Sequence, residues 1–471
     1  MSTMWRIAVR EWRDLGRDPG TLALAAAVLV LLALSVAAVV PRYRATEQWK
    51  AEAAATVRQQ WLTQGERHPH SAAHFGIVAF RAEPATAMLE PGVSAEVGQV
   101  VRLVTHERAF PRHPAAADRT SAVRYAPASP AWLALTLLPF VVIVAGHRAL
   151  SGERESGNLG VLLGTGVSSG TLVAGKVLAV AGVALCLCLA KAAIDLAALL
   201  IAGGAPPWGR WLGLEAVHAA YLGVWVCLAV GASARLKTSQ RALMLLVAIW
   251  MVNTVVVPRV ASSIGRLVVQ EPSLSEFRAA IQRDITYLPD GRPWVETWSG
   301  RLIQETLQRF NVSRIEDLPV GYAGIMLKSS DAHYEDVFAT HFAALDALHR
   351  RQASWHHLVS ITGPLVSAGA LGQAWAGTDL VHVQRFADDA EAYRREIVHR
   401  TNDIIERGST GTGWDLKVGQ AFWESLPSFA ATPPSWSAVW SAHRVDAAVL
   451  GAWLGLAVWW CVSGVRRVSV G

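Results

Sequence analysis

Three histidines in one short stretch have a spacing that could do chemistry. His68, His70 and His74 form the pattern H-x-H-x-x-x-H within the sequence HPHSAAHFG. Imidazole nitrogens at this spacing can bind Zn²⁺ or copper. Histidines that only make hydrogen bonds within a Ser/Ala turn are the simpler interpretation. We therefore expect no bound metal, and we retain these three residues as the candidate ligands if one binds.

A second feature is a pair of opposite charges inside an apolar stretch. Lys191 and Asp195 are four residues apart, which is about one turn of a helix. A lone charge in hydrocarbon costs at least about 3 kcal/mol, so we expect the two to face each other or a bundle interior. Either the pair lines a translocation path or a contact between subunits, or its charges only neutralise each other. Glu215 and His218 pose the same question.

One stretch matches the spacing of a phosphate-binding loop. Gly170 to Lys176 reads GTLVAGK, which fits GxxxxGK. Val177, however, stands where a Ser or Thr hydroxyl must bind Mg²⁺, and no strand precedes the match. We therefore exclude a nucleotide site on this chain, so any ATP and Mg²⁺ must be bound by a separate polypeptide. The chain also has no GxSxG or HExxH motif and no Cys nucleophile outside its apolar stretches, so we predict that it is not an enzyme.

The composition indicates a membrane protein. The 471 residues are 52% hydrophobic and 17% charged, whereas soluble proteins contain roughly 25% charged residues. Uncharged runs of about 20 residues alternate with stretches that carry most of the charge. The net charge of +6 is not accompanied by an aromatic and basic module, so we exclude nucleic acid as a partner. All four cysteines lie in apolar segments, so no disulfides are expected elsewhere.

The apolar runs predict six transmembrane helices. Their approximate bounds are 21–40, 131–147, 177–201, 212–234, 242–257 and 445–464, the third to fifth forming the block 177–257. Basic residues cluster in the segments 1–20, 148–176 and 465–471 and between the fourth and fifth spans. By the positive-inside rule, these segments and both termini are cytoplasmic. Residues 1–20 have the alternating apolar and basic faces of an interfacial helix.

Two long segments remain, 41–130 and 258–444, and the predicted orientation puts both outside the cytoplasm. The second is predominantly helical, because apolar residues recur every three or four positions in 331–352 and 379–407. The first begins with a helix, 42–64, and then loses periodicity, so its fold stays open. The predicted fold is thus a mainly α membrane protein with six transmembrane helices and two large extracytoplasmic insertions.

The short cytoplasmic segment between the second and third spans carries a motif. Its sequence GERESGNLGVLL resembles an E-R-E-x-G-T-L-like element of the ABC-2 class of export permeases. The matching residues are Glu153, Arg154, Glu155, Gly157 and Leu159, and Asn158 replaces the usual Thr. The resemblance implies that this element rests against a separate ATPase. A short charged helix between two spans can move both as a lever when that ATPase closes around ATP.

Motifs in the two long segments extend the resemblance. HPHSAAHFG at 68–76, EPGV at 90–93 and AGTD at 376–379 resemble the subfamily of ABC-2 permeases with large extracytoplasmic domains, the DUF3526 family. This resemblance covers most of the chain. It implies a multi-pass protein of the bacterial inner membrane, with periplasmic domains, working with a dimer of a separate ABC ATPase. Further implied partners are a second copy or a sister permease, membrane lipid and a periplasmic protein.

Three functions therefore compete. The leading one is the membrane permease subunit of an ATP-driven exporter. The alternative is a membrane-anchored protein whose outer domains bind or sense a ligand or metal, although six spans exceed what an anchor needs. A membrane enzyme is disfavoured because no catalytic set is present. The sequence leaves the substrate open, together with the choice between homodimer and heterodimer.

Overall fold

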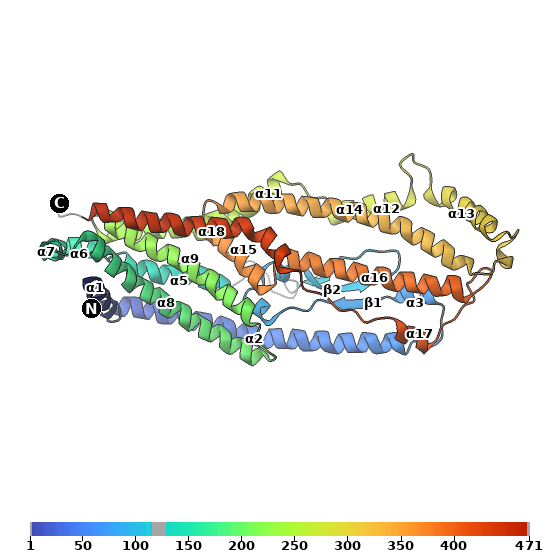
Figure 1. Cartoon of the computed structure of the whole chain (residues 1–471), viewed down its shortest axis with the longest axis horizontal. Coiled ribbons are helices and arrows are strands. Elements are labelled where there is room, and N and C mark those ends of the chain that lie inside the picture. The colour runs from blue at the N-terminus through green and yellow to red at the C-terminus, as the bar shows by residue number, and fades with distance from the viewer. Residues whose placement is uncertain (1, 111, 115–128, 469–471) are drawn as a thin grey trace.

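The computed structural model describes residues 2–110, 112–114 and 129–468, and the described chain is mostly helical and elongated. At one end, the basal end, lie the N- and C-termini with three short helices, α1 (Thr3–Leu15), α6 (Ser151–Glu155) and α7 (Asn158–Gly164). The opposite, distal end contains α13 (Trp294–Phe310) and α17 (Gln420–Ser425) (Figure 1). The predicted mainly helical class is confirmed.

Six helices in the described chain are long and apolar enough to cross a membrane, as predicted. Their ranges are Pro19–Leu62, Pro130–Glu155, Ser169–Ala202, Trp208–Arg235, Ser239–Gly265 and Trp436–Arg467. They contain α2 (Pro19–Leu62), α5 (Pro130–Gly146), α8 (Ser169–Ala202), α9 (Trp208–Arg235), α10 (Ser239–Met251), a π-helical turn η4 (Val252–Val256), α11 (Val257–Val268), α18 (Trp436–Gly464) and the 3₁₀ turn η6 (Val465–Arg467). We call these six helices the bundle. Six such helices are the arrangement of a multi-pass membrane protein.

Helix α2 connects the bundle to the distal end. Asp18 caps its start by accepting a hydrogen bond from the backbone N–H of Thr21 at 2.9 Å, and Pro19 occupies the first turn, where its missing N–H costs nothing. The helix then runs unbroken through Pro41 for 44 residues, about 66 Å at 1.5 Å per residue. It therefore extends well beyond the bundle. This extension is the helix that the sequence predicts for residues 42–64.

The first long segment folds into a small sheet, which the sequence left open. After α3 (Pro69–Phe75), three antiparallel strands pair in the order β1 (Ile77–Phe80), β2 (Gly98–Leu103) and β3 (Arg112–Pro114). Two 3₁₀ turns, η1 (Ala85–Met88) and η2 (Gly92–Ala95), lie between β1 and β2. The alternate residues Ile77 and Ala79 are buried and share a core with Trp61 of α2 and Trp423 of α17. This core, which also takes in α16, holds the sheet on the distal part of the long helices.

The second long segment is helical, as its periodicity predicts. It contains α12 (Leu274–Thr286), α13, the 3₁₀ turn η5 (Ile315–Asp317), α14 (Tyr322–Ser360), α16 (Leu380–Gly408) and α17. A capping box begins α12, where the side chains of Ser273 and Glu276 accept hydrogen bonds from each other's backbone N–H. Helices α14 and α16 pack along each other, and Figure 1 shows α14 running from the distal end back to the bundle.

One helix of that segment packs on the bundle instead of on the distal helices. Helix α15 (Pro364–Ala376) packs against α9 and α18, and its Leu365 and Leu371 belong to the bundle core. The turn before it is also bound to spans, since Trp453 of α18 donates to the carbonyl of Ile361 at 3.1 Å. Thirteen residues are too short to cross a bilayer, which is why hydropathy alone assigned this helix to the outer segment 258–444.

Candidate functional site

The motif at the basal end forms two short helices, α6 and α7, joined at Gly157. This glycine has φ +75°, a left-handed conformation that favours Gly, and a Cβ there would meet nothing within 4 Å. Leu159, in the first turn of α7, is 3% exposed and belongs to the bundle core. Val161 on the same helix is 68% exposed. Helix α7 is thus anchored on one side and presents an apolar side chain on the other.

Glu153 connects α6 to two other helices through one lysine. The ammonium of Lys176 on α8 lies 2.6 Å from a carboxylate oxygen of Glu153 and 2.6 Å from one of Glu11 on α1. Lys176 is 3% exposed, so both ion pairs are sheltered from water. Burial raises the pKa of Glu11, and attraction to Lys176 opposes that rise. The same lysine ends the GxxxxGK match, which is helical here rather than a phosphate-binding loop.

Arg154 and Glu155 bind the two ends of the connection between α9 and α10. The guanidinium of Arg154 donates to the carbonyls of Leu236 at 2.7 Å and Ala234 at 3.1 Å. Carbonyls at the end of a helix such as α9 have no partner within the helix, so Arg154 supplies one. The carboxylate of Glu155 accepts from the backbone N–H of Ser239 at 2.9 Å and from its hydroxyl at 2.5 Å. The three charged residues of the motif therefore contact three different membrane-spanning helices.

The predicted pair within the bundle is part of a larger cluster. Lys191 donates to Asp195 at 2.5 Å and to Glu215 of α9 at 2.8 Å. Lys191 and Asp195 are 1% and 2% exposed. His218, one turn after Glu215, is also buried, and neither of its ring nitrogens has a hydrogen-bond partner among the described residues. Two carboxylates thus surround one ammonium, so the cluster is more acidic than the sequence-predicted pair.

A third carboxylate, Glu90, comes from the loop between η1 and η2. Burial raises the pKa of Glu90 to about 7, although a hydrogen bond from Gly92 N–H and the attraction of Lys191 both act to lower it. The loop is attached to the end of α15, because Thr378 donates to the carbonyl of Glu90 at 2.8 Å and Thr86 donates to that of Ala376 at 3.0 Å. The sequence motifs EPGV and AGTD therefore contact each other. We call residues 84–95 the capping loop, since Leu89 within it packs on α8 and α9.

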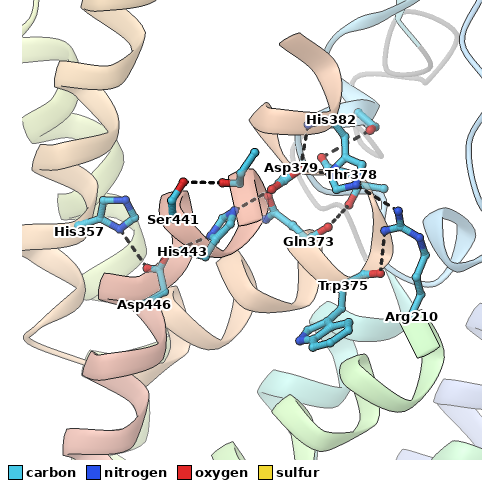
Figure 2. A network of polar contacts seen from close by, with 12 residues as sticks. Arg210, His357, Gln373, Trp375, Thr378, Asp379, His382, Ser441, His443 and Asp446 are labelled. Atoms are coloured by element: carbon cyan, nitrogen blue, oxygen red, sulfur yellow. Dashed lines mark hydrogen bonds and ion pairs between the residues drawn. The ribbon is translucent and has the colours of Figure 1, made fainter. Parts of the chain in front are cut away.

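Alternating histidines and carboxylates join the bundle to the distal helices (Figure 2). Each of these residues contacts the next in the order His357, Asp446, His443, Asp379, His382 and Arg210. They come from α14, α18, α16 and α9, and Asp379 is also the N-cap of α16. We call this set the His–Asp chain. Its members are separated by up to 236 positions in the sequence, so no local pattern could have predicted it.

Asp379 is the centre of that chain. It is 2% exposed and accepts a hydrogen bond from His443 at 2.7 Å and another from His382. Burial disfavours its charge, but these two hydrogen bonds outweigh burial and lower the pKa of Asp379 well below its ordinary value. The carboxylate therefore stays ionised and holds α18 and α16 together. The AGTD motif contained this residue, although the sequence did not indicate its role.

The outer histidines regroup in the structure. His70 and His74 on α3 lie with Nε2 atoms 3.0 Å apart, and His106, which follows β2, joins them within 4.8 Å. His68 is not in this group and contacts the carbonyl of Gly413 at 3.4 Å. Burial, followed by the neighbouring rings of His106 and His74, lowers the pKa of His70 to about 4, so its ring is neutral at pH 7.

Comparisons with known proteins reach only part of the chain. Residues 276–432 match the family model described as a domain of unknown function, DUF3526. The matched range is about a third of the chain and runs from α12 to beyond α17, so it includes α14, α15 and α16. It confirms the predicted DUF3526 resemblance for these residues and says nothing of an export activity. No curated protein matches the chain.

Proposed function

We propose that this chain, with its DUF3526 match and six apolar helices, is the membrane permease subunit of an ATP-driven exporter. A separate ABC ATPase dimer, which binds the ATP and Mg²⁺, docks at the basal end. The basal end and both termini are cytoplasmic, and the distal part lies in the periplasm of a bacterial inner membrane. A second copy or a sister permease completes the membrane part.

The observation that carries this proposal is the set of contacts made by Glu153, Arg154 and Glu155. Through them, one short helix holds α8, the end of α9 and the start of α10. A force on the adjoining α7 therefore reaches three spans at once. Packed helices can switch between two arrangements, and such a switch transmits a small movement at an effector site through a protein. The exposed apolar side chain of Val161 provides a contact for the docking partner.

The remaining clusters supply a route from that element to the distal part. The cluster around Lys191 is the polar region of the bundle that cargo would meet, since charged groups inside a membrane mark transport pathways. The capping loop covers it with Glu90 and Leu89. The His–Asp chain fastens α18 and α9 to α14 and α16. We infer that rearrangement of the spans moves the capping loop and the distal helices together.

Co-purification tests the proposal. The tagged full-length chain is isolated from its native membranes, and bound proteins are identified by mass spectrometry and assayed for ATP hydrolysis. We expect an ABC ATPase to be recovered with the parent chain. Val161→Asp should abolish its recovery, because a charge replaces an exposed apolar contact. Lys237→Ala, at an exposed position of the same end but outside α7, is the matched control and should leave recovery intact.

Arg154→Ala tests coupling apart from docking. It removes the donors for the end of α9 while leaving the exposed face of α7 unchanged. We expect the ATPase still to be recovered, with its hydrolysis no longer responding to the membrane subunit. Recovery of no ATPase with the parent chain would end the proposal. Equal hydrolysis in complexes carrying Arg154→Ala and the parent chain would remove the coupling role of the motif.

A further inference from the structure

The outer histidines are arranged as a set of ligands. We propose that His70, His74 and His106 form a binding site for a divalent transition-metal ion, in the first instance Zn²⁺. One ligand atom from each residue lies within 4.8 Å of the other two, and the Nε2 atoms of His70 and His74 are 3.0 Å apart. Small ring rotations bring three such nitrogens to the roughly 2.0–2.1 Å bond lengths that zinc requires.

The fold brings the three rings together from two elements. His70 and His74 are four residues apart on α3 and therefore share one face of that helix. His106 belongs to the tight turn after β2, in which Val104 pairs with Glu107. That turn is bound to α3, because Thr105 N–H donates to the carbonyl of Ala73 at 3.2 Å. His106 itself has φ +60°, a left-handed conformation that is uncommon for a non-glycine residue.

A buried carboxylate supports the third ligand. Asp331 of α14 is 2% exposed, and its Oδ1 lies 2.9 Å from Nδ1 of His106. Asn402 of α16, itself 1% exposed, donates to the other oxygen of Asp331 at 2.6 Å. A carboxylate at one ring nitrogen fixes the orientation of a histidine and leaves the opposite nitrogen to the metal. The two atoms lie within ion-pair distance but outside hydrogen-bonding geometry, so a small rotation of the His106 ring would complete the contact that metal-binding histidines generally make.

The donor chemistry selects the class of ion. Three imidazoles without a thiolate suit zinc, copper(II) or nickel, whereas Mg²⁺ and Ca²⁺ prefer oxygen ligands. His74 is exposed and His70 and His106 are half-buried, so an ion can enter from solvent. Three protein ligands leave a fourth position of a tetrahedral ion open to water or to a group of another molecule.

Binding would also join the two long segments of the chain. The ligands belong to the first segment, and Asp331 and Asn402 belong to the second, within the DUF3526 match. An ion at the histidines would hold His106 against Asp331 and thereby stabilise the sheet on α14 and α16. An ion that binds only the folded state raises its stability in proportion to the logarithm of ion concentration over Kd. This inference does not depend on the proposed export function.

Isothermal titration of the full-length chain in detergent, freed of metal with a chelator and then titrated with ZnCl₂, tests the site. We expect one ion per chain in the parent protein and in His68→Ala, the matched control from the same sequence motif. His74→Ala and His106→Asn should lose this binding. Asn is chosen at position 106 because it tolerates the left-handed backbone. Asp331→Asn should weaken binding by about 10- to 100-fold.

Melting curves of the metal-free variants check their folding. Variants that melt like the metal-free parent chain but bind no zinc support the site. Absence of saturable binding by the parent chain would overturn it. Zinc binding that survives His106→Asn, or that His68→Ala removes, would also overturn it, because the ligands would then be those of the linear motif rather than the three that the fold brings together.

Discussion

At the scale of single residues, Lys191 is a charged side chain buried within the bundle. Its ammonium is shared by Asp195 and Glu215, and all three groups lie within the apolar length of α8 and α9. Removing charges from water costs several kcal/mol per ion, and close opposite charges recover that cost only while every partner is present. The two carboxylates therefore depend on one lysine.

Lys191→Met should destabilise the protein strongly. It leaves Asp195 and Glu215 facing each other without a cation, and removal of one partner from a buried ion pair costs about 3–5 kcal/mol. We expect a clear fall in the melting temperature of the purified protein in detergent. The triple variant Lys191→Met, Asp195→Asn, Glu215→Gln removes all the charges and should recover most of the loss. If Lys191→Met melts like the parent chain, the three groups do not depend on one another in this way.

Glu90 gives a prediction for pH dependence. Its folded pKa of about 7 lies above the ordinary value of about 4.3, so between these pH values the native state binds a proton that the unfolded state does not. Stability therefore falls as pH rises through this window, by roughly 4 kcal/mol at most. Glu90→Gln should remove this loss and narrow the difference in melting temperature between pH 5 and pH 8. Glu96→Gln, an exposed position of the same region, should leave the difference unchanged.

The sequence could predict the partners that share a helix and not those that come from elsewhere. The sequence predicts a contact between Lys191 and Asp195 because four residues make about one helical turn. The structure has this ion pair. Glu215 comes from the next helix, and Glu90 comes from a loop about a hundred residues earlier. Among the histidines, the i,i+4 pair His70 and His74 was likewise predictable, whereas His106 reaches them only because β2 leads back toward α3.

At the scale of elements, α15 shows what hydropathy cannot assign. The apolar runs of α2, α5 and α8 are long enough to be recognised as membrane spans from the sequence, as predicted. A mainly apolar helix of thirteen residues is consistent with a soluble core helix as well as with a short helix inserted among spans. Its location is decided by contacts, above all by Trp375, whose ring lies on Gly213 of α9. The three short strands were missed for a similar reason, since three to six residues carry little periodic signal.

Substitutions at two glycines of α9 test how closely α15 packs on that helix. A Cβ on Gly213 would lie 2.0 Å from the ring of Trp375, whereas one on Gly209 would meet nothing within 4 Å. Alanine is favoured over glycine in a helix by about 1 kcal/mol, so Gly209→Ala should be neutral or slightly stabilising. Gly213→Ala should instead lower the melting temperature, because it must displace Trp375 from the interface. Equal melting of both variants would show that α15 does not pack closely on α9.

At the scale of the whole molecule, the two ends are built from different elements. The basal end carries the contacts of Glu153, Arg154 and Glu155, and the distal end carries the sheet, α13 and α17. The His–Asp chain lies where the two parts meet and contains an ionised, buried Asp379. This junction therefore gives movement at the basal end a path to α14 and α16, in addition to the continuous helix α2. Under the proposed function, the orientation of these ends decides where an ATPase and a cargo would meet the chain.

Labelling of single cysteines tests that orientation. Val161→Cys introduces a thiol at the basal end and Arg301→Cys introduces one on the exposed face of α13 at the distal end. A membrane-impermeant maleimide should label Arg301→Cys in spheroplasts, and Val161→Cys only in inverted vesicles, because basic residues are retained on the cytoplasmic side. The parent chain is the baseline, since its four free cysteines all lie on spanning helices. The reverse labelling would put the E-R-E element outside the cytoplasm, where no ATP-driven partner could reach it, and labelling of both positions from one side would contradict a bundle that separates the two ends.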